Sequence, residues 1–386
     1  MKQGKVVAWM LMAMLFGCAK EAKVPVTEEP IKIGALFAVT GGAAWLGEPE
    51  KNTALMIAEK INAEGGVLGR PIEVIIEDTE SLEAPAVNAA KKLIQKDNVL
   101  AIIGPSTSGV SMAVIPICQE QEVPLISCAA AAGIVTPVEQ RKWIFKTPQM
   151  DADCVVRIYE HMQNNGISKI GIITVTDGFG KGGRDQLKKL APEMGIEIAA
   201  DETYSPSDTD MVGQLTKIKA KDVQAIVNWS IGPTQSIVPK NIRQLGMTIP
   251  IYQSHGFGNI KYAEAAGEAA EGIIFPAGRL LAVDSLAEDH PQKKVLTEYR
   301  DAYEGRYKDA ASTFGGHAYD ALYLAVEAIK IGGPTRQGIR DGLEKIQGFV
   351  GTAGIFNLSP TDHVGLTKDA FGILTVKDGE FVILED

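Results

Sequence analysis

The sequence predicts an α/β fold built from two similar doubly wound lobes, joined by a hinge and separated by a ligand cleft. Two observations predict this fold. Apolar β-type runs alternate with amphipathic helical stretches, which is typical of βαβ units and of a mostly parallel sheet with helices on both faces. The order of these elements also restarts near residue 169, which indicates that one α/β unit is used twice.

The N-terminus predicts export. Lys2 and Lys5 form a positive region, and Val6 to Phe16 is an uninterrupted apolar run. This run is much shorter than the ~20 residues that a membrane-spanning helix needs, so residues 1–17 are interpreted as a signal peptide.

The end of this segment, Leu15-Phe16-Gly17-Cys18, resembles the lipobox of bacterial lipoproteins. The resemblance implies lipidation of Cys18, which would hold the protein to the periplasmic or extracytoplasmic side of a bacterial membrane. Residues 18–30 are polar, contain two prolines and are interpreted as a flexible tether. Simple cleavage and an uncleaved signal anchor are the alternatives.

The composition is that of a globular, acidic protein. Apolar residues make up 45% of the chain, charged residues make up 22%, and the formal net charge is −10. Such a surface repels phosphate backbones, so nucleic-acid binding is not expected. Cys118, Cys128 and Cys154 lack CxxC spacing, and their odd number leaves at least one thiol unpaired within the chain.

The first lobe is expected to begin with a regular alternation of strands and helices. The expected strands are Ile31–Val39, Ile72–Glu77, Val99–Ile103 and Val123–Ser127, and the expected helices are Pro49–Glu64 and Ala84–Gln95.

Two short segments of this lobe are echoed later in the same order. Lys32–Phe37 is echoed by Lys169–Thr174, and Asn98–Gly104 is echoed by Asp222–Asn228. A chance match of one short strand is common, whereas two matches in the same order indicate a second copy of the unit.

The C-terminal part predicts elements that complete these two lobes and do not begin a third. Its expected helices are Lys293–Tyr307 and Phe314–Ile331, and its expected strands are Gly354–Phe356, Gly372–Val376 and Phe381–Leu384. We therefore expect one lobe from residues 31–148 and 278–354, and the other from residues 149–277 and 355–386.

One glycine-rich loop offers an alternative function. Gly178, Gly180 and Gly183 fit the GxGxxG pattern of NAD-dependent dehydrogenases. An exported protein meets little NAD, and Asp177 places a carboxylate beside the supposed pyrophosphate site. The favoured interpretation is a tight strand-to-helix turn that presents Phe179 to the cleft.

Three other loops follow strands and are expected to face the cleft. Gly104–Gly109 precedes a helix near Val110, where free N–H groups and the helix dipole favour a carboxylate; an N-cap by Ser108 is the simpler alternative. Ser127–Gly133 brings backbone groups to the same edge, and His255 follows a strand of the second lobe. The five histidines have no metal-ligand spacing, and no GxSxG nucleophile motif is present, so neither a metal site nor a hydrolase is favoured.

Taken together, these segments resemble the extracellular solute-binding proteins of branched-chain amino acid ABC transporters, which have the type I periplasmic binding fold. The resemblance runs from about Ile31 to the C-terminus. It rests on KIGALFAVTGGAAWLGEPEKNTALMIAEKINAEGGVLGRPIEV, AIIGPSTSG, VPLISCAAA, TDGFGKGG, GFGN followed by AAEGI, and HAYDALYLAVEAI.

The family resemblance implies where the ligand binds. A serine at a helix N-terminus meets the ligand carboxylate, backbone groups of the alanine stretch assist it, and aromatic residues of both lobes enclose the ligand. The implied contacts are Trp45, Thr107, Ser108, Ala129, Ala130, Ala131, Phe179, Ile231 and His255.

This chain departs from the family pattern at three of these positions. Ala131 lacks the hydroxyl of a usual threonine, Phe179 replaces a usual tyrosine, and His255 replaces the acidic residue that pairs with the α-ammonium group. A buried ammonium without a carboxylate costs several kcal/mol, so a ligand stacked between Trp45 and Phe179 need not be an amino acid. Asp151 is the candidate substitute partner for an ammonium, and the two ligand classes stay open.

We therefore expect a monomeric binding protein, not an enzyme, without a cofactor. It would capture a small carboxylate solute, either a hydrophobic amino acid or an apolar or aromatic acid, and deliver it to an ABC permease by lobe closure. A tethered sensor subunit of the same fold is the alternative.

Overall fold

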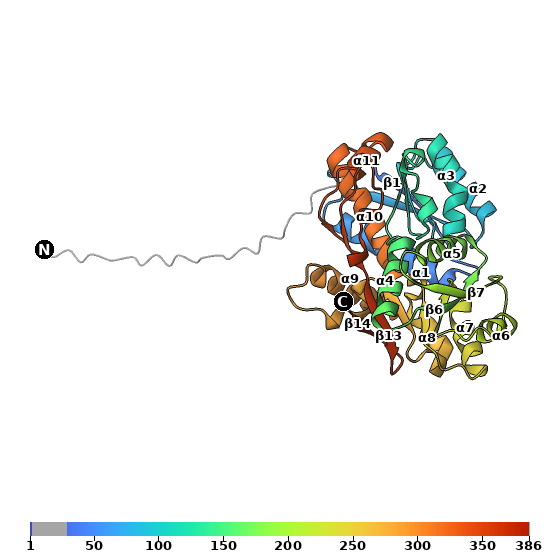
Figure 1. Ribbon diagram of the computed structural model, residues 1–386. Helices are drawn as coiled ribbons and strands as arrows, with labels where there is room; N and C mark the ends of the chain where they lie inside the picture. Colours follow the sequence, from blue (N-terminus) through green and yellow to red (C-terminus); the bar gives the residue numbers. More distant parts are fainter. Residues whose placement is uncertain (2–28, 386) are drawn as a thin grey trace.

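The computed structural model describes Met1 and residues 29–385, and these form two α/β lobes (Figure 1). The predicted fold class is confirmed. Beyond Met1, the expected signal peptide, the lipidation site at Cys18 and the tether up to residue 28 lie outside the described residues.

The first lobe contains a five-stranded sheet in the order β2-β1-β3-β4-β5, and every neighbouring pair is parallel. Its strands are β1 (Ile31–Phe37), β2 (Ile72–Asp78), β3 (Ala101–Ile103), β4 (Leu125–Ser127) and β5 (Ile144–Lys146). A separate two-stranded ladder consists of β11 (Phe349–Val350) and β12 (Ile355–Phe356).

The second lobe repeats this order and then extends it. Its sheet runs β7-β6-β8-β9-β10-β13-β14, so β6 and β8 occupy the positions that β1 and β3 have in the first lobe. Its strands are β6 (Lys169–Val175), β7 (Glu197–Tyr204), β8 (Ala225–Trp229), β9 (Ile251–Gln253), β10 (Ile274–Ala277), β13 (Gly372–Lys377) and β14 (Glu380–Glu385). The two sequence echoes therefore correspond to equivalent strands, and β13 and β14 return antiparallel at the sheet edge.

Helices pack on the sheets of both lobes, as Figure 1 shows. The first lobe has α1 (Ala44–Ala63), α2 (Glu83–Gln95), α3 (Ser108–Glu120), α9 (Lys293–Tyr307), α10 (Thr313–Gly332) and α11 (Arg336–Leu343). The second has α4 (Asp151–Asn164), α5 (Gly178–Leu190), α6 (Val212–Lys219), α7 (Thr234–Gln244) and α8 (Ile260–Ala266). Short 3₁₀ turns are η1 (Ala132–Ile134), η2 (Val138–Gln140), η3 (His255–Phe257), η4 (Gly267–Ala270), η5 (Arg279–Ser285) and η6 (Lys368–Ala370).

The second sheet is buried on both faces, and its strands show the reason. Ile170 and Ile172 of β6 pack into one apolar cluster with α4 and α5, whereas Ile173 and Val175 pack into another with α6, α7 and α8. Side chains of a strand alternate between faces, so a run that is apolar at nearly every position requires helices on both sides. The apolar strand runs thus account for the doubly wound architecture.

Helix α1 begins at Ala44, five residues before the expected start at Pro49. Proline has no N–H to donate to the carbonyl four residues earlier, so Pro49 leaves one carbonyl of α1 without its helical partner. The carbonyl in question belongs to Trp45, and it accepts a hydrogen bond from Nδ2 of Asn259 at 3.1 Å. A side chain of the second lobe therefore satisfies the group that Pro49 leaves without a helical partner.

Three crossings of the chain connect the lobes. The first follows β5 and the second follows β10, and hydrogen bonds tie them to the C-terminal segment. Nε2 of Gln149 donates to the carbonyl of Ala353 at 2.7 Å, and the Arg279 guanidinium donates to the carbonyl of Asp369 at 2.8 Å.

The third crossing lies later than the expected boundary between residues 354 and 355. Strand β12 pairs with β11, and Phe356, Leu358 and Leu366 are buried in the apolar core of the first lobe. The chain enters the second sheet only at Gly372. Residues 355–366 therefore belong to the first lobe, because their ladder partner and their apolar contacts lie there.

The lobes touch across the cleft. Lys261 of the second lobe forms an ion pair with Asp309 at 2.6 Å, and the N–H of Thr313 donates to the carbonyl of Gly258 at 3.1 Å. At the opposing helix N-termini, a Cβ atom on Gly178 would lie 2.7 Å from the backbone nitrogen of Gly109. The structure is therefore a closed arrangement of the two lobes.

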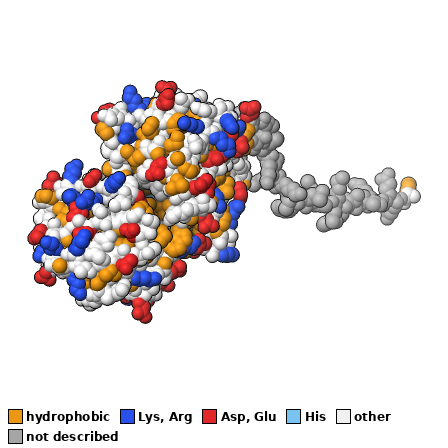
Figure 2. Space-filling model, turned by 90° about the vertical axis from the view of Figure 1, so that its right-hand side faces the viewer, with side chains coloured by type: hydrophobic (Ala, Val, Ile, Leu, Met, Phe, Trp, Pro, Cys, Tyr) orange, Lys and Arg blue, Asp and Glu red, His pale blue; other side chains and the backbone are white. Residues whose placement is uncertain are grey.

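The surface carries interspersed acidic, basic and apolar side chains on the face that Figure 2 shows. Among residues 29–385, no helix has the length and apolar character needed to cross a membrane.

Candidate functional site

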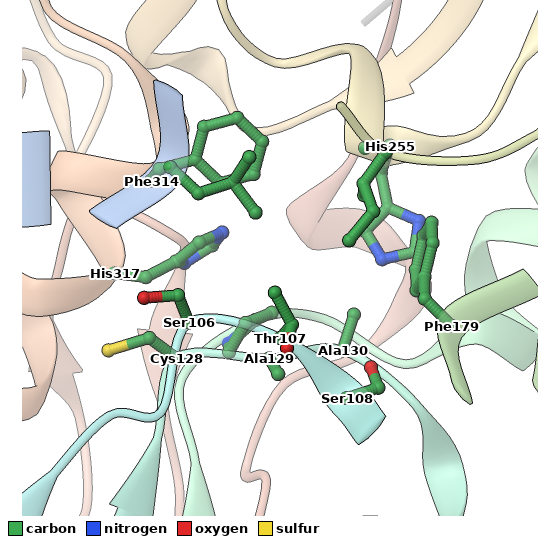
Figure 3. A pocket seen from close by; sticks show the side chains of 14 residues that line it. Ser106, Thr107, Ser108, Cys128, Ala129, Ala130, Phe179, His255, Phe314 and His317 are labelled. Carbon is green, nitrogen blue, oxygen red and sulfur yellow. The ribbon is translucent and has the colours of Figure 1, made fainter. Parts of the chain in front are cut away.

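A cavity lies between the lobes, and its space, together with the adjoining open part of the cleft, amounts to about 350 Å³ (Figure 3). Both lobes contribute to its wall, and most of the lining atoms are apolar. The lining residues are Leu46, Ser106, Thr107, Ser108, Cys128, Ala129, Ala130, Pro148, Phe179, Ile231, His255, Gly256, Phe314 and His317. Seven of the nine expected ligand contacts are in this set, and Trp45 and Ala131 are not.

The first lobe places Ser108 at the start of α3, with Thr107 as the preceding cap residue. The first N–H groups of a helix have no acceptor within the helix, and the helix dipole favours negative charge at that end. The Ser108 hydroxyl oxygen accepts a hydrogen bond from the N–H of Ala131 at 3.2 Å, so its own proton is available to a ligand. This corner of the cavity suits a carboxylate.

The alanine stretch is held in place by its backbone. The N–H of Ala129 donates to the Ser127 hydroxyl at 3.1 Å, and the Lys146 ammonium donates to the carbonyl of Ala130 at 2.7 Å. Ala129 and Ala130 line the cavity, whereas Ala131 lies behind Ser108 and fixes its hydroxyl.

The second lobe contributes Phe179, which is 3% exposed. Helix α5 begins at Gly178, and the Asp177 carboxylate caps it by accepting from the N–H of Gly180 at 2.8 Å. The turn thus presents Phe179 to the cavity.

The glycines of the GxGxxG pattern serve close packing within this protein. A Cβ on Gly178 would collide with Gly109 of the other lobe, one on Gly180 with the carbonyl of Val175, and one on Gly183 with the Trp229 ring. These contacts account for all three glycines, and the dehydrogenase alternative receives no support from them.

Trp45 lies outside the cavity wall, although the sequence placed a ligand between it and Phe179. Its ring packs on Tyr262 of the second lobe, with 5.4 Å between the ring centroids. Consecutive residues of a helix project about 100° apart, so the next residue, Leu46, faces the cavity in its place.

His255 stands in an aromatic cage at the second-lobe side of the cavity. Its ring lies edge-on to Phe179, Trp229 and Phe371, at centroid distances of 5.4, 5.7 and 5.6 Å. Burial lowers the pKa of His255 well below its ordinary value, and the positive charge of Lys146 lowers it further. The imidazole is therefore neutral, with one donor and one acceptor nitrogen.

Asp151 lies behind His255, at the first residue of α4, and it does not line the cavity. Its Oδ1 atom is 3.6 Å from Nε2 of His255, and neither carboxylate oxygen completes a hydrogen bond with a described residue. Burial raises the pKa of Asp151, while Lys146 and the nearby N–H of Ala132 oppose that shift. A carboxylate at this distance favours a protonated His255, but burial and the charge of Lys146 have the larger effect and keep the imidazole neutral.

Lys146 is completely buried and fixes the first crossing. In addition to Ala130, its ammonium donates to the carbonyls of Pro148 and Gln149, both at 2.9 Å. Burial lowers the pKa of Lys146, and the charge of Asp151 raises it. A cation of the first lobe and an anion of the second thus compensate each other next to the hinge.

The sequence did not single out several lining residues. Phe314 and His317 lie three residues apart on one face of α10, a spacing that ordinary core residues of a helix share. Leu46 was hidden by the misplaced start of α1, and Ser106 and Cys128 lie in loops that the sequence did mark.

The three described cysteines are buried and unpaired. Burial raises the pKa of each thiol, to about 12 for Cys118, so they are inert thiols in this environment. Within the described part of the chain, no group of three His, Cys, Asp or Glu side chains is arranged to hold a metal ion.

Two α/β lobes, three crossings and a buried cavity between the lobes define a bilobal ligand-binding protein. Comparison with known proteins gives the family. The model of the family described as periplasmic binding protein matches residues 30–380. The chain belongs to this family.

Curated relatives are amino-acid-binding proteins. The chain is 26% identical over 322 residues to the leucine-, isoleucine-, valine-, threonine- and alanine-binding protein of Pseudomonas aeruginosa, covering 81% of each chain. It is 21% identical over 312 residues to the Leu/Ile/Val-binding protein of Escherichia coli, covering 80% of this chain and 82% of that one.

Solved structures share the whole fold. An extracellular ligand-binding receptor from Rhodopseudomonas palustris HaA2 aligns with a TM-score of 0.87 and 30% identity, over 92% of this chain and 99% of that one. A branched-chain amino acid transporter substrate-binding protein from Streptococcus pneumoniae, solved with isoleucine, aligns with a TM-score of 0.81 and 28% identity, over 92% and 100% of the two chains. These likenesses confirm the type I periplasmic binding fold.

Proposed function

We propose that this protein captures a small carboxylic acid with an apolar or aromatic body, and that the acid lacks an α-ammonium group. The closed lobes then deliver the ligand to an ABC permease. Membership of the periplasmic binding protein family supports the binding role, and the cavity chemistry supports the ligand class.

The carboxylate end of the ligand is assigned to the N-terminus of α3. Ser108 lies there, 2% exposed, with its proton available and with free helix N–H groups beside it. Hydrogen bonds from a hydroxyl and from backbone N–H groups to a carboxylate are charge-assisted, and they are stronger than bonds between neutral groups.

The observation that carries the ligand class is that a neutral His255, and no acidic side chain, lines the inner cavity. An ammonium group buried there would have no carboxylate beside it, which costs several kcal/mol. Asp151, the candidate substitute, lies behind His255 and outside the lining. Glu80, Glu83 and Asp177 line only the outer part of the cleft.

The relatives that are named for their ligands bind amino acids. The proposed ligand class therefore separates this chain from them, and it depends on the replacement of the acidic residue by His255.

Matched ligand pairs test the proposal. The full-length chain in non-ionic detergent is titrated by calorimetry with leucine against 4-methylpentanoate, and with phenylalanine against 3-phenylpropanoate. Each pair differs by the α-ammonium group alone. We expect the deaminated member to bind at least about tenfold more tightly, since an unpaired buried charge costs more than 1.4 kcal/mol.

The variant His255→Glu supplies the missing carboxylate. It should bind the amino acids more tightly than the deaminated acids, which reverses the order found for the natural chain. If the natural chain binds leucine or phenylalanine more tightly than its deaminated partner, the proposed ligand class is wrong. If no carboxylate binds, the assignment of the carboxylate end to Ser108 is wrong as well.

The exported location is proposed from the N-terminal segment together with the family. Lipidation at Cys18 would hold the protein at the membrane beside its permease. Incorporation of labelled fatty acid into the natural chain, and its loss in Cys18→Ser, tests this assignment. A sensor role would use the same site, and transport of the bound acid into cells distinguishes the two.

A further inference from the structure

Two histidines stand on opposite sides of the ligand cavity (Figure 3). His255 belongs to the second lobe, whereas His317 belongs to α10 of the first lobe, one turn after Phe314. The two residues are 7% and 6% exposed. A ligand in the cavity therefore lies between two imidazoles that come from different lobes.

Among the described residues, no hydrogen-bond partner is found for the His317 side chain. Its Nδ1 atom is buried and forms no hydrogen bond with any described residue, and a ring nitrogen points into the cavity in Figure 3. The Thr147 hydroxyl donates a hydrogen bond to the backbone carbonyl of His317 at 3.1 Å, and this bond does not involve the imidazole ring. A buried polar group without a partner costs free energy unless a ligand or another group meets it.

The ring of His317 is neutral. Burial lowers its pKa to about 3, with a further contribution from the charge of Lys146. A neutral imidazole offers one donor and one acceptor, and a hydroxyl group on a ligand matches both because it donates and accepts. A positively charged ligand group is not favoured near His317, because the positive charge of Lys146 already acts on this side of the cavity.

Two other polar groups near His317 offer less to a ligand. The Ser106 hydroxyl donates to the Glu50 carboxyl and accepts from the N–H of Ala38 at 2.9 Å. Cys128 offers only a thiol, which is a weak donor. His317 has a buried ring nitrogen without a partner, which makes it a candidate to bind a polar atom of the ligand.

We propose that His317 is a second polar anchor of the ligand, and that the ligand is a carboxylic acid with a hydroxyl group at the end remote from its carboxylate. The apolar walls formed by Phe179, Ile231, Leu46 and Phe314 hold the part between these two groups. This inference rests on the proposed function, because it takes the carboxylate to lie at Ser108.

Pairs of acids that differ by one remote hydroxyl test the inference. The pairs are benzoate and 4-hydroxybenzoate, 3-phenylpropanoate and 3-(4-hydroxyphenyl)propanoate, and 4-methylpentanoate and 4-hydroxy-4-methylpentanoate. They are titrated into the full-length chain in non-ionic detergent. For the pair that fits the cavity, we expect the hydroxylated acid to bind at least about tenfold more tightly.

Two variants at the same position separate recognition from packing. His317→Leu fills the position with an apolar side chain and removes both nitrogens. It should abolish the preference for the hydroxyl while binding the plain acid at least as tightly as before. The retained affinity for the plain acid shows that the variant is folded. His317→Gln keeps one donor and one acceptor, so it should restore part of the preference. His290→Gln, outside the cavity, is the matched control and should leave the preference intact.

The two failures are distinguishable. Equal affinity for both members of every pair, or loss of both affinities to the same extent in His317→Leu, overturns the role of His317 and leaves the proposed function standing. Failure of every acid to bind overturns the proposed function, and this inference with it.

Discussion

The Nε2 atom of His255 lies 3.6 Å from Oδ1 of Asp151, which is too far for a hydrogen bond, and the imidazole is neutral, so the two side chains form no ion pair. Both side chains are buried, and Lys146 supplies the neighbouring positive charge. The negative charge of this region is therefore balanced behind the cavity wall, and a neutral imidazole is presented to the ligand.

This arrangement changes which ligands the site can accept. A carboxylate on the cavity wall would select for an ammonium group, whereas a neutral imidazole can donate to or accept from uncharged groups. With Ser108 on one side and two neutral histidines on the others, the cavity combines one anion-binding corner with two uncharged polar contacts.

The first prediction concerns the anion-binding corner. Ser108→Ala should weaken a carboxylate ligand such as 3-phenylpropanoate by about 1.5–3 kcal/mol, the scale of a hydrogen bond to a charged group. The corresponding primary amide, 3-phenylpropanamide, is the control ligand, because it carries no charge and should lose less. Calorimetric titration of both ligands measures the difference, and an unchanged carboxylate affinity would remove Ser108 from the site.

The second prediction concerns closure at Gly178. A Cβ atom there would press on the backbone of Gly109 in the opposite lobe, so Gly178→Ala should hinder closure and weaken ligand binding about tenfold or more. Gly213 is a helical glycine with open space around its Cβ position, which makes Gly213→Ala the matched control. This control should leave affinity unchanged and add up to about 1 kcal/mol of stability. Equal ligand affinity in the two variants would show that the closed contact does not limit binding.

The third prediction concerns the bond from Asn259 to the carbonyl of Trp45. Asn259→Asp keeps the oxygen that caps α8 through Lys261, at 3.0 Å, but replaces the donor to Trp45 with an oxygen. The closed form should lose this bond, and the new carboxylate should repel the carbonyl oxygen of Trp45. Ligand affinity should therefore fall severalfold, while the melting temperature of the ligand-free protein changes little. Titration, together with solution scattering with and without 3-phenylpropanoate, measures both effects. A large fall in the melting temperature of the ligand-free protein would instead show that Asn259 stabilises the fold and not the closed form.

The architecture could be predicted from the sequence because its signals are local and repeated. The apolar runs of β1 and β6, and those of β3 and β8, repeat in order because equivalent strands lie in equivalent positions of the two sheets. The loops after these strands also lie close together, because the carboxyl ends of parallel strands lie at the same edge of the sheet.

The details that the sequence missed depend on contacts between distant segments. The expected start of α1 at Pro49 was too late, and the carbonyl that Pro49 leaves without a helical partner is satisfied by Asn259, more than two hundred residues away. That shift turns Trp45 toward Tyr262 and Leu46 toward the cavity. The role of His317 was hidden for a similar reason, because one polar residue on a mostly apolar helix gives no periodic signal.

The fourth prediction concerns Asp320, which holds the C-terminal segment beside the hinge. Its carboxyl accepts from the N–H groups of Thr352 and Ala353, at 2.6 and 2.8 Å, and from the Thr352 hydroxyl at 3.0 Å. Burial nevertheless dominates and raises the pKa of Asp320 to about 7, from an ordinary value near 3.8. The folded protein therefore binds this proton more tightly than the unfolded chain does, and the free energy of unfolding should fall as pH rises from about 4 to about 7.

Between pH 5 and pH 8, this one group should lower the free energy of unfolding by about 2–3 kcal/mol. Asp151 and Glu50, whose pKa values are also raised by burial, act in the same direction. Asp320→Asn cannot titrate, so its unfolding free energy, measured by denaturant titration at pH 5, 6, 7 and 8, should fall less steeply than that of the natural chain. The variant should also be less stable at pH 5, because its amide nitrogen cannot accept the bonds that one carboxyl oxygen accepts now. Parallel pH profiles for the two proteins would show that Asp320 is ionised throughout this range, and that the bonds from Thr352 and Ala353 outweigh its burial.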